Sequence, residues 1–203
     1  MKINKHTYPF TFYEIEEFLT KDENDLLYKK LLDKKEIVDI TLNKAEPNSI
    51  GIDLIDDFGN DIISDILNPK FELSDIKKIT EDTVGGTWGM GGQYHFDHIL
   101  RPHTDNPYEL IQWASEGIIP DREEYGFYKG LVYIGDRSIE YTDYGTRIYE
   151  SEDIKSEFKE VKFIPGNCII FKCDEKSFHG TDFKSEFKYD RFTIGLEYVK
   201  KIQ

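Results

Sequence analysis

The sequence of 203 residues predicts one α+β domain that is mainly β, with helices near its N-terminus and a sandwich or barrel of short strands after them. Three observations favour this fold class. Apolar residues recur at helical spacing in the first eighty residues, strand-like apolar runs fill the remainder, and Gly, Pro, Asn or Asp separates most of those runs. A composition of 38% apolar and 14% aromatic residues excludes a disordered chain.

The helical signals lie in the first eighty residues. An S/T-x-x-E capping box formed by Thr20 and Glu23 predicts a helix from about residue 21 to about residue 33. Apolar residues at helical spacing predict a second helix around residues 53–67. A short opening strand is expected at residues 9–12, and the first helix is expected to pack against a sheet.

The strand signals fill the rest of the chain. Glycines crowd residues 85–92, where they are interpreted as breakers before an extended segment at residues 93–105. The one long connection covers residues 106–127, and connections of that length are usually lids, binding loops or disordered segments; we interpret this one as a lid. Further strands are predicted at residues 130–135, 145–149, 161–164, 168–172, 178–183 and 191–199.

The net charge of −14 restricts the partners. An acidic surface repels phosphate backbones and anionic membranes, so a small molecule, a peptide or a protein is favoured over nucleic acid. The N-terminus lacks the apolar region of a secretory signal, and no segment approaches the ~20 apolar residues that cross a bilayer. We therefore expect a cytoplasmic protein with no membrane partner, while the sequence leaves the oligomeric state open.

A histidine and a carboxylate two residues apart form a candidate metal motif. In an extended segment the side chains of His103 and Asp105 point to the same side and could hold one metal ion. His179, just beyond an apolar strand, could reach the same ion from a neighbouring strand of a small barrel. Two histidines and one carboxylate suit non-haem Fe(II) with open coordination positions.

A basic residue twelve positions after that histidine extends the motif. The guanidinium of Arg191 can fix a carboxylate through two parallel charge-assisted hydrogen bonds. Thr193 lies two residues further, on the same face of an extended segment, where its hydroxyl could add a contact. The pair suits the far carboxylate of a dicarboxylate that chelates iron through a 2-oxo acid end.

With these motifs, residues 93–199 resemble the Fe(II)/2-oxoglutarate-dependent dioxygenases, and the H-T-D-N-P run at 103–107 resembles their prolyl-hydroxylase branch most. The resemblance implies a double-stranded β-helix, or cupin-like jelly roll, at about 81–203, with a helical buttress at about 1–80 of the same single domain. The site residues that it implies are His103, Asp105 and His179 for iron, and Arg191, Thr193 and Tyr133 for the C5 carboxylate of 2-oxoglutarate.

The family chemistry implies a hydroxylase. Such an enzyme uses Fe(II), 2-oxoglutarate and O2, with ascorbate as an optional reductant, and releases succinate and CO2 while it hydroxylates a C–H bond. A prolyl residue of a protein, a free amino acid and other small molecules are the expected substrates, and the acidic composition weighs against a nucleobase.

Two alternatives remain beside this interpretation. His95 and Asp97 form a rival H-x-D pair, which is expected either to line the substrate mouth with Trp113 or to be a solvated strand face. At the level of function, the alternative is a cupin-like metal-binding module without 2-oxoglutarate chemistry, because jelly rolls host many functions. Such a module has no need of Arg191. A catalytically inactive interaction domain is disfavoured by the full ligand set.

Overall fold

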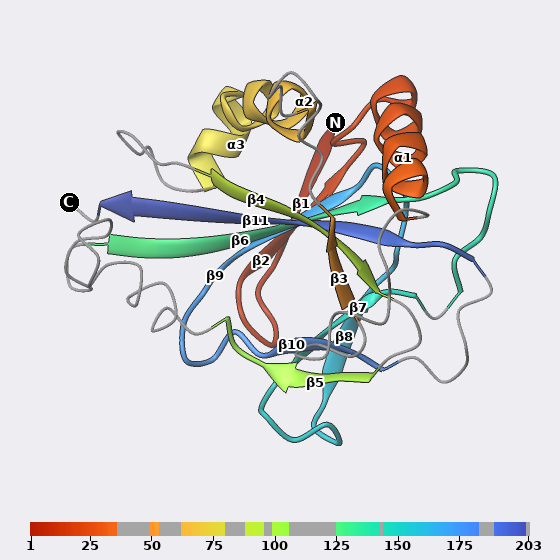
Figure 1. Cartoon of the computed structure of the whole chain (residues 1–203). Coiled ribbons are helices and arrows are strands. Elements are labelled where there is room, and N and C mark those ends of the chain that lie inside the picture. Colours follow the sequence, from red (N-terminus) through yellow and green to blue (C-terminus); the bar gives the residue numbers. More distant parts are fainter. Residues whose placement is uncertain are drawn as a thin grey trace.

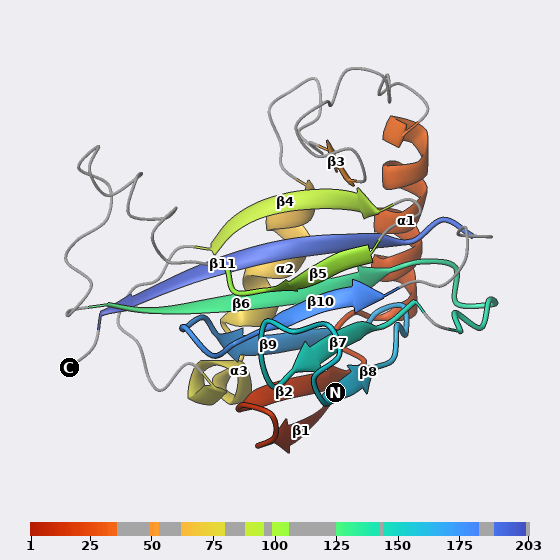
Figure 2. The same ribbon diagram turned by 90° about the horizontal axis from the view of Figure 1, so that it is seen from below.

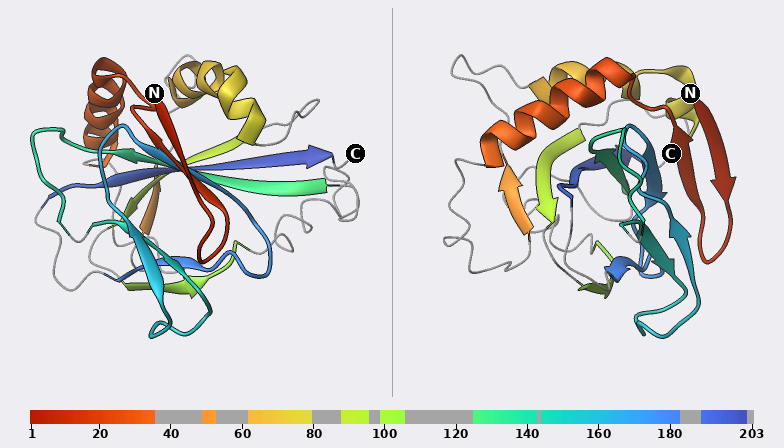
Figure 3. Two further views of the ribbon diagram at one scale, coloured as in Figure 1. Left: turned by 180° about the vertical axis from the view of Figure 1, so that it is seen from behind. Right: turned by 90° about the vertical axis from the view of Figure 1, so that its right-hand side faces the viewer.

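The computed structural model describes eight stretches of the chain, and the structural statements below refer to them. Two antiparallel sheets and three helices form its layers. The helices cover one face of a large sheet, and a small sheet lies against the opposite face (Figures 1 and 3). The described stretches are residues 1–35, 49–52, 62–79, 88–95, 99–105, 125–142, 144–182 and 189–201.

The large sheet has seven strands and the small sheet four, and every neighbouring pair is antiparallel. Figure 2 shows the small sheet in front of the large one. The large sheet runs in the order β1 (Lys2–His6), β2 (Phe12–Glu16), β9 (Cys168–Lys172), β6 (Tyr125–Ile134), β11 (Phe192–Lys201), β4 (Trp88–His95) and β3 (Ser49–Ile52). The small sheet runs β5 (Ile99–His103), β10 (His179–Asp182), β7 (Thr146–Tyr149) and β8 (Phe158–Val161).

The large sheet is apolar on both faces, so it separates two cores. Along β6, Val132 and Ile134 belong to the core under the helices, whereas Phe127 and Tyr133 belong to the core between the sheets. This alternation is the period-two pattern of a strand. The two sheets with their shared inner core form the mainly β, jelly-roll-like fold that the sequence predicts.

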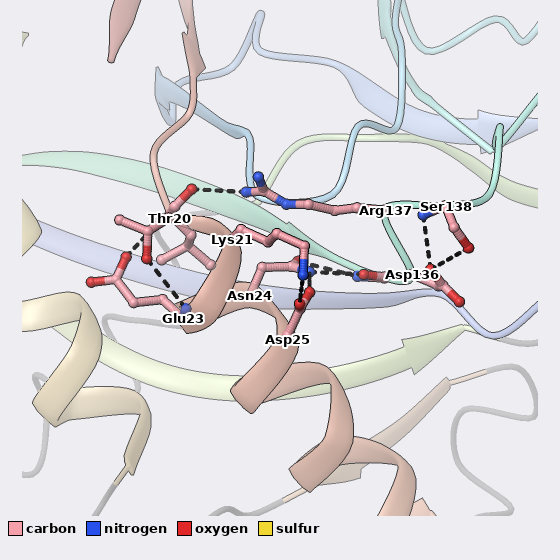
Figure 4. Close-up of polar contacts among 10 residues, drawn as sticks. Thr20, Lys21, Glu23, Asn24, Asp25, Asp136, Arg137 and Ser138 are labelled. Atoms are coloured by element: carbon pink, nitrogen blue, oxygen red, sulfur yellow. Dashed lines mark hydrogen bonds and ion pairs between the residues drawn. The ribbon is translucent and has the colours of Figure 1, made fainter.

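Helix α1 (Lys21–Lys35) confirms the predicted capping box. The Glu23 amide donates to Thr20 Oγ1 at 3.3 Å, and the Thr20 amide donates to Glu23 Oε2 at 2.7 Å (Figure 4). Asn24, fully buried, donates from Nδ2 to the Gly135 carbonyl at 2.9 Å. The start of the helix is therefore tied to the end of β6.

The second predicted helix ends later in the chain than expected. Helix α2 runs over Ile62–Phe71, so it extends beyond the predicted end at residue 67, and residues 53–61 of the prediction lie outside the described residues. The extension has a packing reason, because the Phe71 ring lies 5.3 Å from the Phe18 ring, centroid to centroid. Helix α3 (Ser74–Ile79) follows and buries Ile76 and Ile79.

The opening strand predicted at residues 9–12 is wrong. Residues 7–11 connect β1 and β2, and Pro9, after a cis peptide bond, lies in this connection. Proline has no N–H to donate to a strand ladder, which fits a turn better than a strand. The sequence pattern missed β1 because Ile3 is the only strongly apolar residue in it.

Two further predictions are corrected. The strand predicted at residues 161–164 is instead β8, which ends at Val161, and Phe163 is buried in the inner core without belonging to a strand. The glycine-rich segment at residues 85–92 is not only a breaker. From Trp88 onward it is the strand β4, which is paired with β11 from Trp88 to Tyr94 and with β3 from Gly92 to its end.

The extended segment predicted at residues 93–105 is divided between β4, which ends at His95 in the large sheet, and β5, which begins at Ile99 in the small sheet. The remaining predicted strands are confirmed to within a few residues, except that β6 begins at Tyr125 and is longer than expected. The predicted lid therefore ends by residue 124, and residues 106–124 lie outside the described residues. Among the described helices, none is both long and apolar enough to span a bilayer.

Candidate active site

The two histidines of the predicted motif face each other across the small sheet. His179 in β10 is the direct cross-strand partner of His103 in β5, and the centroids of their rings lie 4.4 Å apart. The register shifts between His179 and Thr181, and bulges of this kind re-aim side chains near functional sites. Asp105 follows two residues after the end of β5. The sequence-predicted triad is therefore assembled.

The donor atoms of the triad are close enough to share one ion. Asp105 Oδ1 lies 3.8 Å from His103 Nε2, and Asp105 Oδ2 lies 3.4 Å from His179 Nε2. One ligand atom from each residue falls within 4.8 Å of the others. Adjacent donors of an ion bonded at about 2.1 Å lie about 3.0 Å apart, so metal binding would draw these donor atoms together by at most about 2 Å. The residues fit a divalent metal.

The tautomer of His179 is set by a backbone carbonyl. Its Nδ1 lies 3.0 Å from the Ser177 oxygen, which can only accept, so Nδ1 carries the proton. Nε2 is then the nitrogen that faces Asp105 and would bind a metal, as in metal sites whose histidines are oriented by a second hydrogen bond. The Phe171 ring, 4.8 Å away between centroids, restricts the imidazole further.

The triad is buried at one end and open at the other. The side chain of His179 is 5% exposed, Asp105 25% and His103 36%. Solvent and ligands can therefore approach the metal position from the His103 side. A facial set of two histidines and one carboxylate leaves coordination positions open on such a side.

Asp105 is ionised in this environment. Burial alone would raise the pKa of its carboxyl, but the contact with His179 and the charges of His179, Lys129 and His103 outweigh it and hold the pKa well below its usual range. Lys129 Nζ lies 3.5 Å from Asp105 Oδ2. A metal ion thus meets a carboxylate that is already charged.

Arg191 is a large charged side chain that is almost fully buried, with 2% of its surface exposed. Its guanidinium carbon lies 4.8 Å from the centroid of the Phe163 ring, a cation–π contact. Burial lowers the pKa of Arg191 to about 10, and the nearby Tyr133 and Tyr144 oppose that shift. The guanidinium is therefore a positive charge at neutral pH inside the core between the sheets.

Thr193 and Tyr133 lie on the same part of the large sheet as Arg191. They are direct cross-strand partners in β11 and β6, which places their side chains on one face. Thr193 Oγ1 is buried and makes no hydrogen bond with the described residues. The three residues that the resemblance assigns to a C5 carboxylate are thus brought together.

Tyr133 links this Arg191 cluster, formed by Arg191, Thr193 and Tyr133, to the small sheet. Its hydroxyl donates to Thr146 Oγ1 in β7 at 2.7 Å, and its burial raises the pKa of the phenol, so it stays a donor. Thr146 lies two residues before Ile148, and Ile148 is the cross-strand partner of His179. Strand β7 therefore connects the two parts of the site, through Ile148 beside the metal triad and Thr146 beside Tyr133.

Several solved structures share this architecture over nearly the whole chain. A prolyl-4-hydroxylase of Pseudomonas putida matches with a TM-score of 0.57 at 10% identity, over 95% of this chain and 93% of that chain. A prolyl hydroxylase from Trichoplax adhaerens, in complex with a hypoxia inducible factor peptide fragment, matches with a TM-score of 0.62 at 13% identity, over 93% of this chain and 83% of that chain. HygX from Streptomyces hygroscopicus, with nickel and 2-oxoglutarate bound, matches with a TM-score of 0.54 at 14% identity, over 92% of this chain and 81% of that chain.

The chain has the fold of the 2-oxoglutarate dioxygenases. No protein-family model matches the sequence, and the search of curated proteins finds no match. At these identities the likeness concerns the fold. Within this 2-oxoglutarate dioxygenase fold, the H-x-D…H triad stands on the small sheet, and the Arg191 cluster stands on the large sheet.

The predicted substrate residues receive no such support. His95 is the last residue of β4, where its backbone is paired with Ser49, whereas Asp97 and Trp113 lie outside the described residues. Among the described residues it is His103, and not His95, that joins a group able to hold a metal. The roles of His95, Asp97 and Trp113 stay predictions.

Sequence reasoning missed Lys129. It lies in β6, four residues before Tyr133, and approaches the triad from the opposite sheet. Period two along β6 could have placed it on the inner face with Phe127 and Tyr133. Its proximity to Asp105 depends on how the sheets stack, which the sequence pattern does not give.

Proposed function

We propose that this protein is an Fe(II)- and 2-oxoglutarate-dependent dioxygenase that hydroxylates a C–H bond of its substrate. One observation carries the proposal. The triad of His103, Asp105 and His179 and the buried Arg191 border the same inner core of a 2-oxoglutarate dioxygenase fold. A cupin-like metal-binding module would account for the triad but not for a charged guanidinium inside that core.

The triad would hold the metal. Nε2 of each histidine and a carboxylate oxygen of Asp105 are the donor set typical of non-haem Fe(II) sites. Bound Fe(II), together with 2-oxoglutarate, would supply the activation of O2. The protein contributes a carboxylate that is already ionised and an imidazole, His179, that is already oriented by Ser177.

The Arg191 cluster would anchor the cosubstrate. A guanidinium can donate two parallel hydrogen bonds to a carboxylate, and such charge-assisted bonds are stronger in a buried site than in water. Thr193 Oγ1 is available for a further contact. Anchoring the far end of 2-oxoglutarate here would leave its 2-oxo acid end directed toward the metal.

The proposed substrates are a prolyl residue of a peptide or protein, or a free amino acid. The Trichoplax adhaerens hydroxylase is bound to a peptide fragment, and HygX has also been solved with hygromycin B. Both matches support an opening wide enough for varied ligands in this fold. The exposed His103 side of the triad is the proposed approach for the substrate.

The test is turnover. The purified protein is incubated with Fe(II), ascorbate, 2-oxoglutarate and O2, and succinate is measured with and without candidate peptides and amino acids. We expect succinate in the wild type and none in His103→Ala or Asp105→Ala. His6→Ala, a histidine on β1, is the matched control. Succinate release by either triad variant would contradict the assignment, and a +16 Da product in mass spectra would identify the substrate.

A further inference from the structure

Lys129 is a cation on the opposite sheet from the metal ligands. Its backbone is held between two neighbours in the large sheet, with Phe171 in β9 and Glu197 in β11 as its cross-strand partners. Its side chain is 15% exposed, and its Nζ lies 3.5 Å from Asp105 Oδ2. The metal-binding carboxylate therefore has a positive charge fixed beside it.

The net charge of the metal position changes sign as ligands bind. Asp105 gives it one negative charge when it is empty. A divalent cation on neutral histidines changes that to one positive charge. The chelating carboxylate of the 2-oxo acid then brings the charge of this position back to zero, because the far carboxylate of 2-oxoglutarate would be held at Arg191. A nearby ammonium opposes the second state, and the chelating carboxylate relieves that repulsion in the third, because Coulomb energies are large in a partly buried site.

From this we propose that Lys129 couples the two ligands, so that the metal binds tightly only together with the 2-oxo acid. The inference rests on the proposed function, and it names a residue outside the metal triad and the Arg191 cluster. It depends on the change in charge between states, so it holds whatever other groups the ammonium contacts. Coupling is reciprocal, so the metal also promotes 2-oxoglutarate binding by the same factor.

Lys129 and Arg191 have different tasks in this scheme. Arg191 is buried in the inner core beside Phe163 and Thr193, where the far carboxylate would be held. Lys129 is beside Asp105, where the metal and the chelating end would meet. Loss of Arg191 should weaken only ligands with a second carboxylate. Loss of Lys129 should weaken the response of the metal to any 2-oxo acid.

The experiment measures the dissociation constant of Mn²⁺ by calorimetry under nitrogen, with and without saturating 2-oxoglutarate. The ratio of the two constants is the coupling factor. It is determined for the wild type, Lys129→Met, Lys129→Gln and Lys129→Arg. Lys172→Met is the matched control, because it removes the same charge from an exposed site on the neighbouring strand β9. Circular dichroism of the metal-free proteins shows which variants are folded.

We expect the coupling factor to fall at least tenfold in both neutral variants and to stay at the wild-type value in Lys129→Arg and Lys172→Met. An unchanged factor in a folded neutral variant would overturn the inference while leaving the proposed function intact. If 2-oxoglutarate left Mn²⁺ binding unchanged in the wild type, both the inference and the proposed function would fail.

Discussion

His103 and His179 are direct partners across the β5–β10 ladder, and their ring centroids lie 4.4 Å apart. The backbone ladder therefore fixes two of the three metal donors relative to each other. Asp105, beyond the end of β5, completes the set. Loss of one histidine leaves two donors of the three.

Removing His179 should abolish tight metal binding. We expect His179→Ala to weaken Ni²⁺ affinity by a factor of a hundred or more in calorimetry. Mutating a residue that only supports a metal ligand typically lowers metal affinity about 10–100-fold, and loss of the ligand itself should cost more. Among the described residues, His6 contacts Glu14 and no residue of the triad, so His6→Ala should bind Ni²⁺ with the wild-type affinity. Equal affinity in both variants would mean that the metal binds elsewhere.

Replacing Arg191 should weaken the binding of the cosubstrate without weakening the binding of the metal. In Arg191→Met we expect 2-oxoglutarate to bind about 10–100-fold more weakly, since hydrogen bonds to charged groups contribute about 1.5–3 kcal/mol. Pyruvate, a 2-oxo acid without a second carboxylate, should bind the variant and the wild type equally. A parallel loss for both acids in calorimetric titrations would remove Arg191 from the proposed anchoring role.

The hydroxyl of Tyr133 should contribute to stability. Tyr133→Phe leaves the buried Thr146 Oγ1 without its 2.7 Å donor, which should lower the free energy of unfolding by about 1–3 kcal/mol in urea denaturation. Tyr8→Phe is the control, because its hydroxyl donates to Glu157 on the exposed surface, where little stabilisation is expected. Equal losses of unfolding free energy in the two variants would show that the hydrogen bond between the sheets stabilises the fold no more than a surface hydrogen bond does.

The capping box should stabilise α1 without affecting the site. Thr20→Ala removes the acceptor of the Glu23 amide, and we expect a loss of about 0.5–2 kcal/mol in the free energy of unfolding. Succinate release per folded molecule should stay at the wild-type rate. Thr142→Ala, at an exposed turn, should change stability by less than about 0.5 kcal/mol. No loss in Thr20→Ala would mean that the cap is dispensable.

The sequence predicted the triad because its signals are local. His103 and Asp105 share a face through the period of two, and His179 follows a strand, β9, whose bounds were predicted correctly. Turn residues also placed β7, β10 and β11 to within a few residues. Where patterning and turn chemistry agree, element type follows from a single sequence.

Three of the failures share a physical cause, which is that contacts between residues distant in the sequence decided the structure. Glycines in β4 weaken a strand on their own, yet ladders to β3 and β11 hold it. Phe71 extends α2 through its contact with Phe18. Lys129 gains its importance from Asp105, which approaches it from the other sheet.

The most direct test of the central claim is an anaerobic titration of the Fe(II)-loaded protein with 2-oxoglutarate, followed by visible absorption. Chelation of Fe(II) by a 2-oxo acid produces a metal-to-ligand charge-transfer band. We predict a band that saturates with 2-oxoglutarate and is absent in Asp105→Ala. Tightly bound iron with an unchanged visible spectrum throughout the titration would contradict the account and leave a metal-binding module without 2-oxoglutarate chemistry.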